Sequence, residues 1–226
     1  MYDIVFISYQ EPNAEHRYSA LKKRFPYVKR VHGIKGIHQA HIEAAKIAIT
    51  NMFWVVDADA IIVEDFDFTY IPDFINQDAV HVYTSKNPIN GLEYGYGGVK
   101  LLPRDATLNL DTTSTDMTTS ISNKFIVMNQ LSNISAFNVD AFSTWRSAFR
   151  ECAKLASKTI DRQNKEETDE RLKTWTTYAS GDYSGDALRG ARDGMRFGLS
   201  NSSNLNLIND FDWLKEKFNQ NPKIIR

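Results

Sequence analysis

The first part of the chain alternates short apolar runs with helical segments, and this alternation constrains the fold more than any other feature. Apolar runs rich in β-branched and aromatic residues occur at 3–9, 28–33, 52–63 and 79–85, and segments with helical periodicity separate the first three. Strand and helix repeated in this order are typical of a sheet whose parallel strands are joined by helical crossovers. The sequence therefore predicts an α/β fold with a mixed, mostly parallel, Rossmann-like sheet flanked by helices.

The composition is that of an ordinary globular protein. Of 226 residues, 42% are hydrophobic and 24% are charged, and the net charge is −1, so a nucleic-acid partner would need a local basic patch. The one cysteine, Cys152, cannot form an internal disulfide, which favours a reducing compartment. No uncharged apolar stretch approaches the roughly 18 residues that span a bilayer. We expect a cytoplasmic protein with no membrane partner.

We expect one domain over 1–226 with three parts. The first, 1–86, would bind a nucleotide, 87–163 would face an acceptor, and 164–226 would form a helical appendage that closes with a helix near 208–218. A helix is also expected at about 139–163. In contrast, the glycine-rich segment and the polar Thr/Ser/Asp stretch at about 90–122 predict long loops, and loops of that length are functional or mobile.

The helix expected after Gly36 has an apolar face suited to packing on a sheet. At 100° per residue, this face comprises Ile37, Ala40, His41, Ala44, Ala45, Ile47 and Ala48. His41 is therefore expected to be a buried histidine with its hydrogen bonds satisfied rather than a ligand.

Two aspartates at the end of an apolar run are the best chemical signal. Asp57 and Asp59 follow the run FWVV, and side chains at i and i+2 of a strand point the same way. At the carboxyl end of a parallel strand they would face the crevice where open α/β sheets bind ligands. Oxygen ligands suit Mn²⁺ or Mg²⁺, which also bind pyrophosphate. The alternative is a pair of solvated turn aspartates, which the apolar residues on both sides make less favourable.

Other phosphate-binding and nucleophilic motifs are missing from the sequence. There is no G-x-x-x-x-G-K-[ST], the first strand is followed by SYQEPN rather than G-x-G-x-x-G, and there is no G-x-S-x-G. A P-loop nucleotidase, a dinucleotide-binding Rossmann unit and an acyl-transfer enzyme are therefore disfavoured. The segment around Gly97 and Gly98 predicts a tight loop in which the backbone approaches a ligand.

Several strings resemble a known family. SYQEPN, GIHQAHIEAAK and VVDADA resemble the nucleotide-binding half of a GT-A glycosyltransferase. SKNPINGLEYGYGGVKLLPR and SNISAFNVDAFSTWRSAFRE are similar to small GT-A-like proteins of tailed bacteriophages related to the T-even group. The resemblance covers most of 1–163. It implies a metal-dependent glycosyltransferase in the infected host cell that transfers a sugar, with arabinose as the candidate, from a UDP-sugar to 5-hydroxymethylcytosine in phage DNA.

The resemblance also implies roles for individual residues. Donor-binding roles fall to Ser8, Tyr9, Glu11, Lys35, Gln39 and Asp57. Metal-binding roles fall to Asp57 and Asp59, and no histidine follows His81 to serve as the third ligand common in the family.

If the reaction inverts the anomeric centre, a carboxylate base is needed; Asp116 is the first candidate, and Asp140 and Glu151 are rivals. Acceptor-side roles fall to Tyr94, Tyr96, Gly97 and Gly98, with the tyrosines able to stack on an extruded base. For Tyr9, Lys35, the two tyrosines and each candidate base, an ordinary structural role is the alternative.

A basic stripe bears on the acceptor. Cations repeat every four residues along the expected helix, at Arg146, Arg150, Lys154, Lys158 and Arg162. Such a row could follow a phosphate backbone, and each neutralised phosphate would add counterion release. A solvated helix face is the alternative reading.

Two further hypotheses remain open at this stage. The protein could transfer a sugar to a glycan, a protein or a small molecule instead of DNA. It could also be a non-catalytic GT-A-like module that binds nucleotide or DNA.

Overall fold

The structure, a computed structural model, describes residues 1–158, 164–200 and 202–220. The chain divides into two compact units. Unit 1 comprises Met1–Asn87 with Glu93–Ala136, and unit 2 comprises Pro88–Leu92 with Phe137–Arg226. The expected division at 163/164 differs from this boundary, because the helix that begins at Ala141 packs with the C-terminal helices of unit 2.

Unit 1 is a mixed sheet. Its elements in chain order are β1 (Asp3–Ser8), α1 (Ala14–Arg24), β2 (Lys29–His32), α2 (Ile37–Ile47), β3 (Met52–Asp57), β4 (Ala60–Ile62), the 3₁₀ turn η1 (Phe74–Asn76), β5 (Val80–Lys86), β6 (Glu93–Pro103), α3 (Arg104–Leu108), α4 (Met117–Ile121) and β7 (Phe125–Ser135). Among the described residues the sheet has seven strands in the order β2-β1-β3-β6-β5-β7-β4. β6 is antiparallel to β3 and β5, β4 is antiparallel to β7, and the other pairs are parallel.

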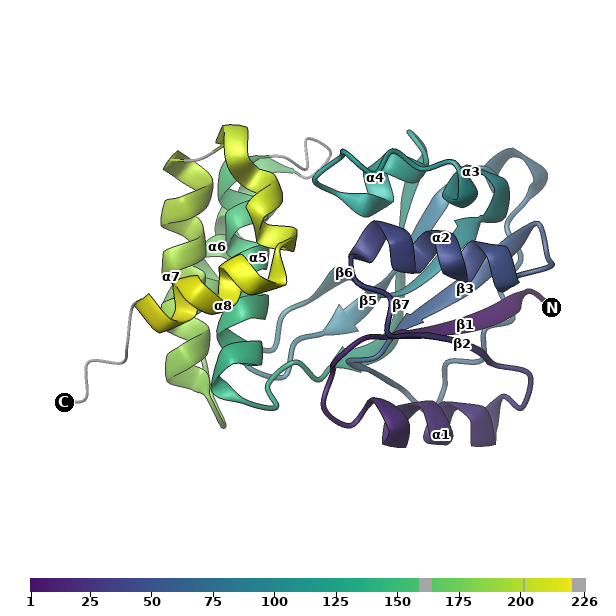
Figure 1. The fold of residues 1–226 in the computed structure, drawn as a ribbon, viewed down its shortest axis with the longest axis horizontal. Helices are drawn as coiled ribbons and strands as arrows, with labels where there is room; N and C mark the ends of the chain where they lie inside the picture. Colours follow the sequence, from purple (N-terminus) through teal and green to yellow (C-terminus); the bar gives the residue numbers. More distant parts are fainter. Residues whose placement is uncertain (159–163, 201, 221–226) are drawn as a thin grey trace. The chain divides into compact units, whose positions relative to one another are not determined.

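Helices cover both faces of this sheet (Figure 1). On one face, Ala14 and Leu21 of α1 share a core with Trp54 of β3, and Phe66 and Phe68 pack edge-on against the same indole ring. On the other face, the alanines of α2 share a core with β1 and β3, joined by Met117 and Ile121 of α4. The prediction of a mixed, mostly parallel, Rossmann-like α/β sheet flanked by helices is confirmed.

The expected face of α2 is largely confirmed. Ala40, His41, Ala44 and Ala45 are buried, whereas Ile47, at the end of the helix, is 38% exposed. The ring of His41 is fully buried and its Nδ1 lies 2.8 Å from the carbonyl oxygen of Ile37. Burial, reinforced by the nearby Lys100 ammonium, lowers the pKa of His41 from 6.5 to about 3. His41 is thus a neutral buried histidine as the sequence predicts, but only one of its ring nitrogens is satisfied, because Nε2 has no hydrogen-bond partner among the described residues.

Two expectations about loops were wrong. The glycine-rich segment lies within β6, and the polar stretch after it contains the short helices α3 and α4. Glycine in a strand marks a bulge or a close backbone approach, and the pairing of β5 with β6 shifts register between Val82 and Thr84. Strand β7 has no counterpart in the sequence prediction because its side chains are mostly half-buried or exposed and lack apolar alternation.

Unit 2 contains the helical C-terminal part of the chain. Its elements are α5 (Ala141–Ser157), α6 (Lys165–Thr177), α7 (Ser184–Ser200), the 3₁₀ segment η2 (Ser202–Asn209) and α8 (Phe211–Gln220). An aromatic core around Trp145 and Phe149 of α5 includes Leu214 of α8. The closing helix is therefore confirmed. α5 ends at Ser157, because Lys158 adopts a left-handed backbone conformation with φ 57°, and the expected helix end near 163 lies outside the described residues.

Glycines bring α5 and α7 into backbone contact. A Cβ atom added at Gly190, Gly194 or Gly198 would lie 2.1–2.4 Å from the carbonyl oxygens of Trp145, Phe149 and Ala153, respectively. Real Cβ atoms do not approach a backbone oxygen this closely. The two helices can pack at this distance only because α7 has hydrogen atoms at these three positions.

Within the described residues, no helix combines the length and apolarity that crossing a bilayer requires.

We predict that Gly194→Ala destabilises the protein strongly. The new methyl group would collide with the carbonyl of Phe149, and overpacking of this kind costs about 3 kcal/mol. Denaturant unfolding would measure the loss. Gly185→Ala is the matched control, because nothing lies within 4 Å of a Cβ on that glycine of the same helix. Equal stabilities of the two variants would contradict the close packing.

We predict that His41→Gln flattens the acid side of the stability profile. Because the folded-state pKa of His41 is lowered to about 3, its contribution is fully present above its unfolded pKa of 6.5 and is lost as pH falls through this interval. One such group contributes a slope of about 1.4 kcal/mol per pH unit. Unfolding measured between pH 7 and 5 would show this slope in the parent and in His16→Gln, an exposed control, but not in His41→Gln. Identical slopes in all three proteins would refute it.

Candidate functional site

Five charged side chains from unit 1 form what we call the charged cluster: Glu11, Arg17, Asp57, Asp59 and Lys100. Glu11 follows the carboxyl end of β1, and Asp57 is the last residue of β3. Since β1 and β3 are parallel neighbours, their carboxyl ends meet at one edge of the sheet, where open α/β sheets bind ligands. The two aspartates of the motif thus lie at the edge that the sequence predicts.

Lys100 reaches Asp57 from the neighbouring antiparallel strand. Its Cα is opposite that of Val55 in the β3–β6 pairing, two residues before Asp57. Its Nζ lies 2.8 Å from Asp57 Oδ2 and also donates to the carbonyl oxygen of Gly97. Lys100 is 2% exposed. A buried ammonium is tolerated only when it is paired and hydrogen-bonded, and Asp57 and Gly97 meet that need.

Asp59 lies in the turn between β3 and β4, so strand alternation alone does not place it. Its carboxylate is nevertheless close enough to Asp57 and Glu11 for their charges to act on it. Burial, together with these two negative charges, raises the pKa of Asp59 to about 6, although Arg17 and Lys100 oppose the shift. Burial is the largest of these causes, and the neighbouring carboxylates add to it.

Arg17 connects α1 to this edge. Its guanidinium donates to the carbonyl oxygens of Ala58 at 2.8 Å and Ala136 at 3.3 Å. Burial lowers the pKa of Arg17, while the charges of Asp59 and Glu11 oppose that effect. Glu11 Oε2 accepts a hydrogen bond from the backbone N–H of Tyr9 at 2.6 Å. The turn after β1 is thereby tied to the cluster.

The donor set of the cluster suits a hard divalent cation. Mg²⁺ is usually bound by one or two carboxylates together with substrate phosphates, rather than by a complete cage of protein ligands. Among the described residues no group of three or more His, Cys, Asp or Glu side chains is arranged to hold a metal, but Asp57 and Asp59 supply two neighbouring carboxylates. A bound cation would offset the repulsion that Asp57 and Glu11 exert on the Asp59 carboxylate.

The other residues predicted to bind a donor are at or near the ends of β1 and α2. Ser8 is 2% exposed, and its Oγ lies 2.9 Å from His32 Nδ1 and accepts from Arg30 Nε at 3.1 Å. Tyr9 is half-buried, Lys35 is exposed, and the exposed Gln39 donates to Glu43 Oε1 at 2.9 Å. Their roles toward a ligand stay predictions.

The residues predicted to face an acceptor lie in β6. Gly97 has a φ of +91°, and a Cβ on Gly98 would lie 2.6 Å from the side-chain amide of Asn133, so both glycines are required by the local structure. Tyr94 is buried, with 6% of its surface exposed. The side chain of Tyr96 lies outside the described part of the structure.

Two of the three candidate bases are helix caps. Asp116 caps α4 by accepting from Thr119 N at 3.1 Å and Thr118 Oγ1 at 2.6 Å. Asp140 caps α5 in the same way through Ser143. Glu151 is a half-buried residue of α5. A capping role is structural, so a catalytic role for any of them stays a prediction.

The basic stripe is only partly open to solvent. Arg146 stacks over the ring of Phe211, with its Cζ 5.2 Å from the centroid, and Arg150 donates to Asn209 Oδ1 at 3.0 Å. Lys154 is half-buried and Lys158 is exposed. Arg162 lies outside the described residues. DNA contact by this stripe stays a prediction, and Lys158 is the most exposed of its described members.

Sequence reasoning missed Arg17 and Lys100. A signal existed for Lys100, because it is a single lysine inside the apolar run GVKLLP, and a lone charge in a buried strand needs a partner. No comparable signal existed for Arg17, which lies among exposed or half-buried residues of α1.

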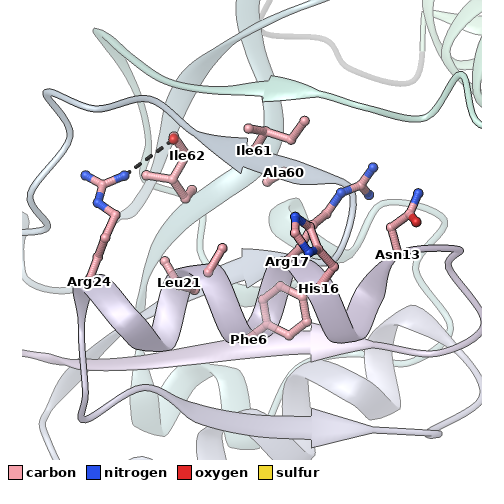
Figure 2. Close-up of a pocket in the computed structure, with 10 residues that line it drawn as sticks. Phe6, Asn13, His16, Arg17, Leu21, Arg24, Ala60, Ile61 and Ile62 are labelled. Carbon is pink, nitrogen blue, oxygen red and sulfur yellow. Dashed lines mark hydrogen bonds between the residues drawn. The ribbon is translucent and has the colours of Figure 1, made fainter.

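A cavity of about 360 Å³ lies between α1 and β4 (Figure 2). Phe6, Leu21 and the three residues of β4 supply apolar walls, and basic side chains of α1 border it. Arg24 donates to the carbonyl oxygens of Ile62 and Val63, and Arg17 donates to that of Ala58. These two arginines therefore hold α1 against the β4 segment on either side of the cavity.

Comparisons with known proteins add little to this geometry. No protein-family model matches the chain, and no curated protein sequence matches it. Among solved structures, HddC from Yersinia pseudotuberculosis is similar over 59% of this chain and 70% of its own, with 15% sequence identity and a TM-score of 0.35. A likeness this distant has no bearing on function, so the case for a function rests on the charged cluster and the sequence motifs.

Proposed function

We propose that this protein is a metal-dependent glycosyltransferase of the GT-A type. It transfers a sugar, with arabinose as the candidate, from a UDP-sugar to 5-hydroxymethylcytosine in phage DNA. The observation that carries the proposal is the pair of neighbouring carboxylates, Asp57 and Asp59, at the carboxyl edge of a mostly parallel sheet, with the pKa of Asp59 raised to about 6. The resemblance of the sequence strings to phage GT-A proteins supplies the donor and acceptor.

In this proposal Asp57 and Asp59 hold the divalent ion. When bound, Mn²⁺ or Mg²⁺ would act as a Lewis acid that stabilises the charge on the departing UDP. Arg17 would help to orient the motif by donating to the carbonyl oxygen of Ala58 between the two aspartates, and Lys100 by binding Asp57. The turn carrying Tyr9 and Glu11 borders the same edge and would receive the nucleoside part of the donor.

Transfer requires the acceptor hydroxyl oxygen to bond to the anomeric carbon as the bond from that carbon to the diphosphate breaks. In an inverting reaction the hydroxyl proton passes to a carboxylate base, and Asp116 remains the first candidate, with Asp140 and Glu151 as rivals. A retaining reaction would need no such base. The hydroxymethyl group would be reached in the major groove, or on a flipped base. Tyr96 is the candidate to stack on such a base, whereas Tyr94 is buried and would have to move to do so.

One incubation separates the hypotheses. The protein is mixed with Mn²⁺ and a panel of UDP-sugars, with DNA that contains either hydroxymethylcytosine or cytosine, and the nucleosides are weighed by mass spectrometry. A mass gain only on modified DNA supports the proposal. UDP release without modified nucleoside favours another acceptor or hydrolysis. Absence of both UDP-sugar binding and turnover favours a non-catalytic module.

We predict that Asp59→Asn abolishes sugar transfer and weakens Mn²⁺ binding while the protein remains folded. The amide is nearly isosteric but carries no charge to hold the cation. Turnover would be followed by UDP release and metal binding by calorimetry. Asp65→Asn is the matched control, because Asp65 is an exposed aspartate of the same unit outside the cluster. Full activity in Asp59→Asn would remove the metal-binding role of this residue.

We predict that Lys154→Glu combined with Lys158→Glu weakens DNA binding in a salt-dependent way. Loss of two phosphate contacts reduces the slope of log affinity against log salt by about 2. The comparison is the double variant Lys165→Glu, Lys173→Glu on α6, which changes the net charge equally at two exposed lysines outside the stripe. A slope that is unchanged in the first variant would exclude the stripe from DNA contact.

A further inference from the structure

We propose that Lys100 is a positioning residue that acts as an internal counter-ion, competing with the divalent metal for Asp57 until a diphosphate binds. The inference rests on the proposed function, and it adds the order in which the site is filled. Metal alone should bind weakly, and the nucleotide diphosphate should strengthen metal binding by giving the Lys100 ammonium another anion.

The contacts of Lys100 are the first support. Its Nζ lies 2.8 Å from Asp57 Oδ2, which is the distance of a charge-assisted hydrogen bond. A metal ion at that oxygen would stand next to the ammonium, and two cations a few Å apart repel each other strongly where water is scarce. Lys100 and a metal ion therefore cannot both hold this oxygen at full strength.

The burial of Lys100 is the second support. The side chain is only 3% exposed, whereas that of Asp57 is 28% exposed. The ammonium cannot turn into bulk water as a surface lysine would, because its backbone is fixed in β6 by pairing with β3. When it leaves Asp57 it must find another anion or acceptor within reach.

The second contact of Lys100 is with Gly97, which lies at a turn within β6. Its Nζ donates to the carbonyl oxygen of Gly97, whose φ of +91° marks a turn in the strand. The neighbouring Gly98 lies against the Asn133 amide, where a Cβ would have no room. The Lys100 ammonium is thus held by two acceptors, Asp57 Oδ2 and the Gly97 carbonyl oxygen, and it would keep the second when a diphosphate draws it from the first.

The composition of the charged cluster is the third support. Its three carboxylates outnumber its two cations, and Lys100 is the cation that binds Asp57 directly, through Oδ2. Lys100 therefore determines when this oxygen becomes available to a divalent ion.

The test measures Mn²⁺ binding directly, by electron paramagnetic resonance of the free ion, without turnover. Wild type, Lys100→Met and Lys100→Arg are titrated with and without UDP, and thermal melting confirms that each is folded. We expect Lys100→Met to bind Mn²⁺ alone at least tenfold more tightly than wild type and to gain less affinity from UDP. Lys100→Arg, which keeps the charge, should bind metal alone no more tightly than wild type.

Lys86→Met is the matched control. Lys86 also pairs with a carboxylate of unit 1, that of Glu93 at 3.2 Å, but it lies outside the cluster. Its variant should bind Mn²⁺ as wild type does. If Lys100→Met binds Mn²⁺ no more tightly than Lys86→Met, the counter-ion role is overturned while the proposed function stands. If no protein binds Mn²⁺ even with UDP, the metal role in the proposed function falls as well.

A measurement on the wild-type protein covers the case in which Lys100→Met does not fold. The ammonium signal of Lys100 is observed by ¹H–¹⁵N NMR, assigned by its loss in Lys100→Arg, during addition of Mg²⁺ and UDP. A shift of this signal when both are added, larger than with Mg²⁺ alone, supports the displacement. A signal that stays in place with both present overturns it.

Discussion

The ion pair between Lys100 and Asp57 is the interaction on which the edge of the sheet depends. It joins two strands that run in opposite directions and places a buried positive charge beside the turn that carries Asp59. Removing one partner from a buried pair costs about 3–5 kcal/mol, and the partial exposure of Asp57 favours the lower end of that range. The pair therefore fixes the geometry of the first motif aspartate and sets the charge that a ligand meets.

The antiparallel strand β6 makes this pair possible. A sheet with only parallel strands would bring the carboxyl ends of β1, β3 and β5 together, but no side chain from a returning strand would point across that edge. Because β6 lies between β3 and β5 and is antiparallel to both, its residue Lys100 can reach Asp57 at the carboxyl end of β3. The glycines near the start of β6 give the strand the turn and the close approach to Asn133 that this path requires.

Unit 2 is held together by a different kind of constraint. Its helices α5 and α7 touch through backbone atoms at three glycines, and aromatic side chains around Trp145 fill the space beside them. This packing does not depend on charged side chains. In the same unit, the first two arginines of the basic stripe contact Phe211 and Asn209. The periodicity of a charge pattern along one helix did not reveal this, because the segments that cover these arginines come some sixty residues later in the chain.

The sequence by itself determined the elements with a clear pattern of apolar residues. β1 and β3 are continuous apolar runs, and the buried face of α2 and the apolar residues of α8 recur at helical spacing. It also indicated that Asp57 and Asp59 lie at an edge of the sheet, because acidic residues directly after a short apolar run mark the end of a buried strand. Only the tertiary structure decided that β6 and β7 are strands, that Asp116 and Asp140 cap helices, and that Arg17 and Lys100 join the aspartates. The pattern of residues along one segment indicates which of its side chains are buried. Ion pairs across strands and glycine contacts between helices depend instead on which distant segments meet in the fold.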